Sequence, residues 1–167
     1  STTLTAINDN PDVAPLTDSI KEGASHNLDL LTGATDIEGD TLHIEQLTYS
    51  IDGAPSTTQL PSGLSLAADG HTLMIDATNP AYNHLASGQS LKIAVSYLVN
   101  DGHGGQSQQT ADLTIQGTDD KAALVSNVIQ LTENQALDRE FKTYKGNLQL
   151  LDPDSGDKTQ FVFSGKY

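Results

Sequence analysis

The chain has 167 residues, no cysteine, and 8 basic against 22 acidic residues, which gives a net charge of −14. This charge repels phosphate backbones and anionic lipid surfaces, so we expect neither nucleic-acid binding nor direct membrane insertion. Without cysteine the fold has no disulfide and no thiolate metal site. Self-repulsion at such a charge favours the uptake of cations.

Short runs rich in Val, Ile, Leu and Thr, bounded by Gly, Pro, Asn and Asp, follow one another along the chain, and helix signals are nearly absent. The pattern predicts strands at 12–20, 26–31, 41–50, 64–68, 71–78, 91–99 and 106–116. Residues 56–60 are ambiguous, and residues 82–86 have the pattern of one helical turn. Strands at this spacing predict an all-β, immunoglobulin-like antiparallel β-sandwich.

Two local signals are the clearest. In "LSLAADGHTLMID" the Asp69-Gly70 turn separates two alternating runs, which predicts a hairpin that pairs 64–66 with 73–75. In "LKIAVSYLVNDG" every second residue from Leu91 to Val99 is apolar, which predicts a strand with one buried face.

The sandwich is predicted to span residues 10–118, after a linker or the end of a preceding repeat at 1–9. Residues 119–167 hold strand patterns at 123–131, 146–151 and 159–163, too few for a second complete sandwich. An internal repeat supports two modules, because Asp120 aligns with Asp9, Glu133 with Glu22, and Asp152 with Asp36. We interpret the chain as a piece of a longer polypeptide that carries one sandwich and the N-terminal part of another.

Several segments together resemble the VCBS and cadherin-like repeats of bacterial RTX adhesins. They are "NDN", "DIEGDTL", "LPSGLSLAADG", "AYNHLASGQSLKIAVSYLVNDGHGG" and "LTIQGTDD" in the first 120 residues, and "LTENQAL … GNLQLLDPDSGDKTQFVF" after them. The resemblance implies extracellular β-sandwich modules in series, stiffened by Ca²⁺ at their junctions. It also implies type I secretion to the bacterial cell surface and a part in cell adhesion or biofilm formation.

Two acidic loops have the residue types that Ca²⁺ prefers, since the ion takes six to eight oxygen ligands. Asp36, Glu38 and Asp40 alternate in the first loop, and Asp152, Asp154 and Asp157 follow a similar spacing in the second. Neither loop is an EF-hand, since in the first Thr41 and Leu47 occupy the positions that require Gly and Glu.

If successive loops alternate between the two ends of the sandwich, the acidic residues divide into two clusters, as at cadherin junctions. The N-terminal cluster is predicted to contain Asn8, Asp9, Asn10, Asp36, Glu38, Asp40 and Asp101. The C-terminal cluster is predicted to contain Glu22, Asp119, Asp120, Asp152, Asp154 and Asp157. Both are predicted Ca²⁺ sites, and only the second has both of its modules within this chain.

An alternative is that these Asp, Asn and Gly residues only form turns, and we interpret Asp52, Asp69 and Asp76 as turn or surface residues. The five histidines show no zinc-ligand spacing, and no nucleophile motif of a hydrolase is present. We therefore expect no catalytic residue, and no cofactor other than Ca²⁺.

The sequence favours a Ca²⁺-rigidified, non-enzymatic extender or scaffold module of a secreted adhesin. Its expected partners are neighbouring repeats of the same polypeptide, with host-cell or biofilm ligands reached through adjacent modules. A second hypothesis is that this piece itself binds a ligand or receptor. A third is an accessory domain of a carbohydrate-active enzyme, although aromatic residues are only 5% of the chain and tryptophan is absent.

Overall fold

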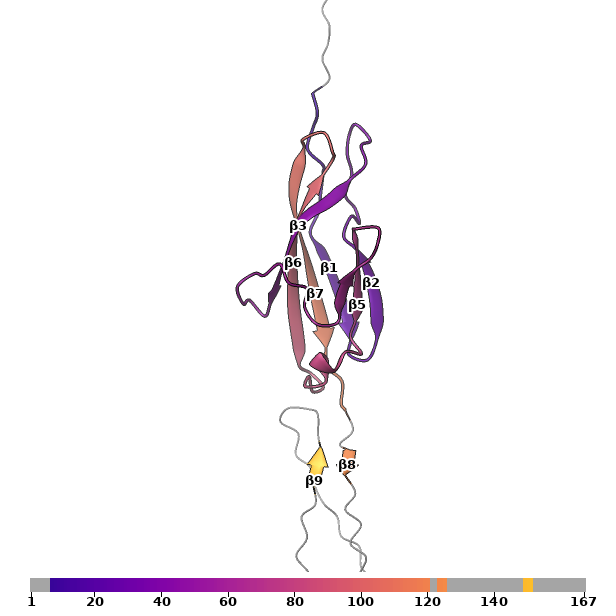
Figure 1. Ribbon diagram of the computed structural model, residues 1–167, viewed down its shortest axis with the longest axis vertical. Helices are drawn as coiled ribbons and strands as arrows, with labels where there is room; N and C mark the ends of the chain where they lie inside the picture. The colour runs from indigo at the N-terminus through magenta and orange to yellow at the C-terminus, as the bar shows by residue number, and fades with distance from the viewer. Residues whose placement is uncertain (1–6, 121–122, 126–148, 152–167) are drawn as a thin grey trace, which may run out of the picture.

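The computed structural model describes residues 7–120, 123–125 and 149–151, and two β-sheets face each other within residues 16–116 (Figure 1). One sheet has the order β1 (Leu16–Lys21), β7 (Gln106–Gln116), β6 (Ser90–Asn100) and β3 (His43–Ile51). The other has the order β2 (Ser25–Asp29), β5 (Thr72–Asp76) and β4 (Leu64–Leu66). The predicted all-β, immunoglobulin-like sandwich is confirmed.

Strands β6 and β7 form the long central hairpin of the four-stranded sheet. They pair in one continuous antiparallel register from Ser90↔Gln116 to Asn100↔Gln106. Alternate residues of each strand point inward, as the period of two in the sequence predicts. From β6 these are Ile93, Val95, Tyr97 and Val99, all at most 1% exposed, whereas Leu91 is only partly buried.

The core lies between the two sheets and closes at the lower end of Figure 1 with the connection after β5. The opposite sheet and the loops contribute Leu30, Leu64, Leu73, Ile75, Tyr82 and Leu85. The predicted hairpin is confirmed, since Leu64 pairs with Ile75 and Leu66 with Leu73.

Strand β1 differs from the prediction in direction and extent. It runs parallel to β7, with Leu16 opposite Ala111 and Lys21 opposite Gln116, so the sandwich is not wholly antiparallel. The strand also begins at Leu16, because Asp12 instead forms an isolated bridge with Thr35, with N–O distances of 2.7 and 2.9 Å. The segment predicted as one strand, 12–20, therefore divides into an isolated bridge at Asp12 and strand β1.

Two connections that the sequence left less certain can now be described. The ambiguous residues 56–60 form no strand, and only Thr57 pairs, through a bridge to Tyr49 on β3. The expected helical turn at 82–86 is a 3₁₀-helix at Pro80–Tyr82 (η1). It begins there because Asn79 caps the Ala81 N–H and Pro80 has no N–H to leave unpaired.

The loops lie at the two ends of the domain as predicted. Residues 7–12, the β2–β3 loop and the β6–β7 loop gather at the upper end of Figure 1. Glu22 lies at the other end, where its N–H donates to Gln116 O at 2.8 Å. Beyond the sandwich, β8 (Ala123–Val125) pairs antiparallel with β9 (Gln149–Leu151), and the predicted strand at 159–163 lies outside the described residues.

Candidate metal centre at the N-terminal end

Three chain segments meet at the N-terminal end of the sandwich. The Asn10 side-chain oxygen accepts from Gln106 N–H at 3.2 Å, and Pro11 O accepts from the Ser107 hydroxyl at 2.5 Å. The bridge between Asp12 and Thr35 attaches the same segment to the β2–β3 loop. Residues 8–12 therefore lie between the two loops that carry the predicted acidic ligands.

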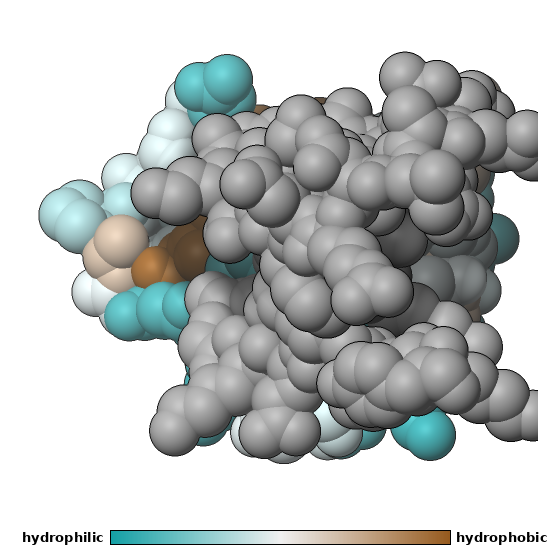
Figure 2. All heavy atoms as spheres, turned by 90° about the horizontal axis from the view of Figure 1, so that it is seen from below, coloured by the Kyte–Doolittle hydropathy of each residue, from teal (hydrophilic) through white to brown (hydrophobic). Residues whose placement is uncertain are grey.

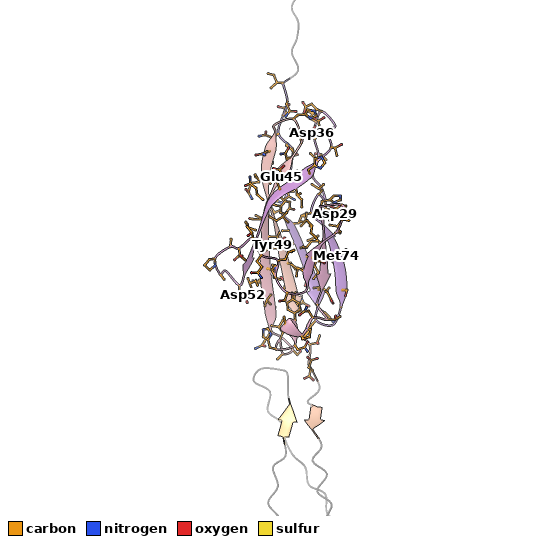
Figure 3. The ribbon with its side chains drawn as sticks, in the orientation of Figure 1. Asp29, Asp36, Glu45, Tyr49, Asp52 and Met74 are labelled. Atoms are coloured by element: carbon orange, nitrogen blue, oxygen red, sulfur yellow. The ribbon has the colours of Figure 1, made fainter. Side chains whose placement is uncertain are left out.

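Asp36, Asp40 and Asp101 bring their carboxylates together at this point. One oxygen of each lies within 4.8 Å of the other two. Asp101 is 2% exposed, and the other two are partly buried. Asp36 marks this end of the molecule in Figure 3.

Asp36 organises its own loop and leaves one oxygen unused. Its Oδ1 accepts from Glu38 N–H at 3.0 Å and from Asp40 N–H at 3.1 Å. Gly39 allows this tight turn because its φ is +82°, a conformation that other residues rarely adopt. The Asp36 Oδ2 atom is fully buried and accepts no hydrogen bond from any described residue. A carboxylate oxygen in that state is suited to a cation.

Asp101 is held as an anion by four donors. Its Oδ1 accepts from His103 N–H at 2.7 Å and Gly105 N–H at 3.0 Å, and its Oδ2 accepts from Asn8 Nδ2 at 2.7 Å. Burial by itself would raise the pKa of Asp101, but these bonds and the Gly104 N–H outweigh it and hold the pKa below the ordinary value.

The remaining predicted members lie at the rim. Asp9 N–H donates to Glu38 Oε2 at 3.4 Å, and both residues are exposed. The Asp9 carbonyl oxygen faces Gly105, where an added Cβ would lie 2.7 Å from it. Asn10 uses its oxygen on Gln106 as described above. The structure thus brings three of the seven predicted residues into mutual reach, with Asn8 bonded directly to one of them.

His103 is a neighbour that sequence reasoning missed. Its Nδ1 lies 3.0 Å from Asp40 Oδ2, and its side chain is 64% exposed. The only hint in the sequence is its place in "DGHGG", directly after Asp101. Among the described residues no lysine or arginine pairs with the three carboxylates, so the histidine is their nearest basic group.

This donor set suits a hard cation. Three carboxylates this close repel one another, most strongly where they are shielded from water. Ca²⁺ is bound by carboxylate, amide and backbone oxygens in flexible geometry. The fit rests on the buried, unpaired Oδ2 of Asp36 together with the carboxylates of Asp40 and Asp101.

Comparison with known families identifies the sandwich. The model of the bacterial Ig domain matches residues 8–114, close to two thirds of the chain. The chain belongs to the bacterial Ig domain family. The match covers nearly all of the described sandwich, with the β2–β3 and β6–β7 loops. It does not distinguish VCBS or RTX-adhesin repeats from other bacterial Ig domains.

Two solved structures are distantly similar to this chain. The N-terminal four Ig domains of Dscam1 isoform 6.9 are 18% identical over 69% of this chain and 27% of theirs, with a TM-score of 0.41. A nucleoside hydrolase-related hypothetical protein from Saccharophagus degradans, described as associated with carbohydrate metabolism, is 18% identical over 66% and 26%, with a TM-score of 0.38. The chain thus spans about a quarter of these two. No curated protein matches.

The C-terminal cluster of the Ig domain is described only in part. Glu22 is 8% exposed, and its Oε2 accepts from Thr118 N–H at 3.3 Å, directly before Asp119 and Asp120. Asp152, Asp154 and Asp157 lie outside the described residues. Their role as ligands therefore stays a prediction.

Three other acidic residues accept hydrogen bonds at or beside turns of the Ig domain, two of them from neighbouring residues and Asp52 from a distant strand. Asp52, on the projecting β3–β4 loop in Figure 3, accepts from Lys92 N–H at 2.8 Å. Asp69 accepts from His71 N–H, Thr72 N–H and the Thr72 hydroxyl at 2.7 to 3.0 Å. Asp76 accepts from both the N–H and the hydroxyl of Thr78. All three are exposed, which agrees with their interpretation as turn or surface residues.

The surface offers two further observations. No helix among the described residues is long and apolar enough to span a membrane. Seen from the lower end, the coloured surface that the grey atoms leave visible is mostly hydrophilic around a small hydrophobic patch (Figure 2).

Proposed function

We propose that this bacterial Ig domain is a non-catalytic structural module of a secreted bacterial surface protein, and that Ca²⁺ at the N-terminal cluster stiffens it. The observation that carries the proposal is the convergence of Asp36, Asp40 and Asp101 around a buried, unpaired carboxylate oxygen. A bound cation would also lower the electrostatic self-repulsion of the folded chain, whose net charge is −14.

The mechanism is mechanical. A cation bound by Asp36 and Asp40 from one loop and Asp101 from the other would tie these loops together. Asn8 bonds to Asp101, so the same ion would fix the direction in which residues 8–12 reach the domain. Neighbouring modules of the same polypeptide would then keep a constant angle, which is what an extender requires.

The narrower assignment is to the repeats of RTX adhesins, with type I secretion and a role in adhesion or biofilm formation. It rests on the sequence resemblance, and it is compatible with a family whose members are often extracellular or surface-associated. The C-terminal cluster, with Glu22, Asp119, Asp120 and the acids at 152–157, would be the second Ca²⁺ junction.

The test is calcium titration of the whole chain by calorimetry and thermal unfolding, with EDTA and with Mg²⁺ for comparison. We expect Ca²⁺ to raise Tm, since ligand at about 100 times Kd adds about 2.7 kcal/mol to folding stability. The double variant Asp36→Asn/Asp40→Asn keeps the oxygen that accepts the loop N–H groups but removes two charges. Ca²⁺ should no longer raise the Tm of this variant. In EDTA its Tm should be no lower than that of the wild type.

The matched control is Asp112→Asn/Glu45→Gln, which removes two charges from exposed strand positions outside the cluster. It should keep the calcium response. The proposal fails if Ca²⁺ leaves the Tm of the wild type unchanged, or if both double variants respond to Ca²⁺ as the wild type does.

A further inference from the structure

A small apolar pocket lies toward the C-terminal end of the sandwich, away from the proposed calcium site. Its volume is about 170 Å³. Sites for small molecules are usually roughly 300–1,000 Å³, so this pocket is better suited to a single side chain. No charged residue lines it, and besides the core residue Ile93 its lining consists of Ile51, Pro61, Ser62, Ala81, Tyr82 and Leu91.

The pocket has a fixed floor and an exposed apolar rim. Tyr82 is 3% exposed, and its hydroxyl donates to Ser62 O, which holds the ring in place. At the rim, Ile51 is 38% exposed, and the neighbouring Leu60 is 39% exposed. Single exposed apolar residues are common on protein surfaces. A preformed apolar hollow with apolar residues beside it instead indicates contact with another surface.

The chain leaves the sandwich beside this pocket. Gly117 N–H donates to Gln89 O at 2.9 Å, and a Cβ added at Gly117 would lie 2.3 Å from Leu85 O. Leu85 N–H donates in turn to Tyr82 O at 2.9 Å, and Leu91 is two residues after Gln89. The segment that follows Gly117 therefore begins next to the residues that line the pocket.

The β8–β9 pair directs a particular segment back to this end of the sandwich. Strand β8 begins six residues after Gly117, a distance of at most about 20 Å. Its first residue, Ala123, pairs with Leu151, the last residue of β9. The end of β9 is therefore the end nearest to the sandwich, and the β9 arrow points that way in Figure 1. The sequence continues from Leu151 as "DPDSGD", residues 152–157.

The internal repeat identifies the apolar residue of this segment. Asp152 aligns with Asp36, so Pro153 occupies the position of Ile37. Ile37 is 81% exposed in the β2–β3 loop at the N-terminal end of the Ig domain. The loop of the first module thus presents an apolar side chain outward, and the corresponding residue of the second module is also apolar.

We infer that Pro153 packs into the pocket between β3, η1 and β6, and that this contact seats the second module on the Ig domain. The inference rests on the proposed function as a module in series, and it adds an apolar contact to the predicted cation junction. The short connection keeps the effective concentration of the segment at the pocket high, so one small contact suffices. Because the contact is apolar, it does not require Ca²⁺.

The test is a cysteine pair in the whole chain, which has no cysteine of its own. Ser62→Cys/Pro153→Cys joins the pocket to the segment, and Cys keeps a small apolar side chain at 153. The control is Ser19→Cys/Pro153→Cys, since Ser19 is exposed on β1, at the other edge of the four-stranded sheet from β3. Under mild oxidation in EDTA, the first pair should form an intramolecular disulfide about tenfold faster, because the two Cα atoms must approach within about 7 Å.

A charge placed in the pocket should abolish this difference. Ala81→Glu, at an exposed position in the lining, should slow disulfide formation by the Ser62 pair to the rate of the control. Ala54→Glu adds the same charge on the exposed β3–β4 loop outside the lining and should leave the rate unchanged. Equal rates for the two cysteine pairs, or no effect of Ala81→Glu, would overturn the inference.

Two further outcomes separate this inference from the calcium proposal. Disulfide-linked dimers in place of monomers would assign the pocket to a second copy of the chain, and the inference would be wrong. The Tm of the chain with Ca²⁺ is measured separately, without oxidation. A calcium response without the Ser62–Pro153 cross-link would refute the seating alone, and the cross-link without a calcium response would refute the calcium proposal alone.

Discussion

Tyr97 and Leu30 are joined by a hydrogen bond of 2.7 Å from the Tyr97 hydroxyl to the Leu30 carbonyl oxygen. The bond crosses the core from β6 to the residue that follows β2, and both side chains are fully buried. It therefore connects the two sheets at the position where the core approaches the N-terminal loops.

Alkaline pH should weaken this link. Burial raises the pKa of Tyr97 to about 12, above the ordinary value of 10.0. The protonated Tyr97 hydroxyl contributes its full stabilisation below pH 10. This stabilisation is lost as the pH rises towards 12, because the tyrosine ionises at lower pH in the unfolded chain than in the folded one. Up to roughly 2 kcal/mol of folding free energy should disappear over this range, measured by urea unfolding at several pH values.

The variant Tyr97→Phe isolates the effect. Loss of the bond to Leu30 should lower stability at pH 7 by about 1 kcal/mol, and the alkaline decline should be shallower than in the wild type. Tyr49 and Tyr82 also have raised pKa values through burial, so some decline remains. An unchanged alkaline slope in the variant would assign the decline to those two residues.

Gly63 should tolerate no side chain. Its φ is +79°, and an added Cβ would lie 2.6 Å from Asp76 O and 2.8 Å from Tyr82 Cε2. We expect Gly63→Ala to cost about 1 kcal/mol for the backbone conformation and a further 1–3 kcal/mol for displacing Tyr82. Chemical denaturation at pH 7 measures the sum.

Gly70 is the matched control for that steric effect. Its φ is +80°, nearly the same, but an added Cβ meets no atom within 4 Å. Gly70→Ala should therefore show only the backbone cost. Equal losses in the two variants would mean that Tyr82 moves aside freely and that the contact contributes nothing.

Asp69 should make the β4–β5 hairpin sensitive to strong acid. Hydrogen bonds from the Thr72 hydroxyl, His71 N–H and Thr72 N–H lower the pKa of Asp69 to about 2. A lowered pKa means that the stabilisation is present above the ordinary value and is lost as the pH falls through 2. Asp69→Ala should lower Tm at pH 7, and the difference from the wild type should shrink towards pH 2. A difference that is constant with pH would contradict the role of the charge.

The parts of the fold that the sequence predicted best are those fixed by neighbouring residues. Alternation and the Asp69-Gly70 turn are enough to set the pairing of Leu64 with Ile75. The bounds predicted for β7, 106–116, agree with the strand for the same reason. The direction of a strand relative to its neighbour could not be predicted in this way, because residues 16–21 contain no local signal that they pair in parallel with β7.

The candidate calcium site could likewise be predicted only in part. Residue type and loop order were enough to place Asp36, Asp40 and Asp101 at one end. Which ligands converge depends on the path of the backbone, which turns the Asn10 oxygen to Gln106 and brings His103 to Asp40. These contacts join residues more than 60 positions apart, and no spacing rule reaches that far.

Gly105 should link the stability of the domain to its calcium site. An added Cβ would lie 2.1 Å from Asp101 Oδ2, 2.7 Å from Asp9 O and 3.0 Å from Asn8 Nδ2. Gly105→Ala should therefore push the Asp101 carboxylate away from Asp36 and Asp40 or displace the segment at Asn8. We expect a stability loss of about 1–3 kcal/mol in EDTA, typical of overpacking, and a weaker calcium response than in the wild type.

The control for Gly105 is Gly53→Ala, which changes a glycine on the projecting β3–β4 loop where an added Cβ meets no atom within 4 Å. It carries a backbone cost because its φ is +78°, but it should keep the full calcium response. Calorimetric titration of both variants with Ca²⁺ separates the loss of folding stability from the loss of calcium binding. If Gly105→Ala lost stability in EDTA yet bound Ca²⁺ with wild-type affinity, the contacts at Gly105 would support the fold alone, and the ion would lie elsewhere.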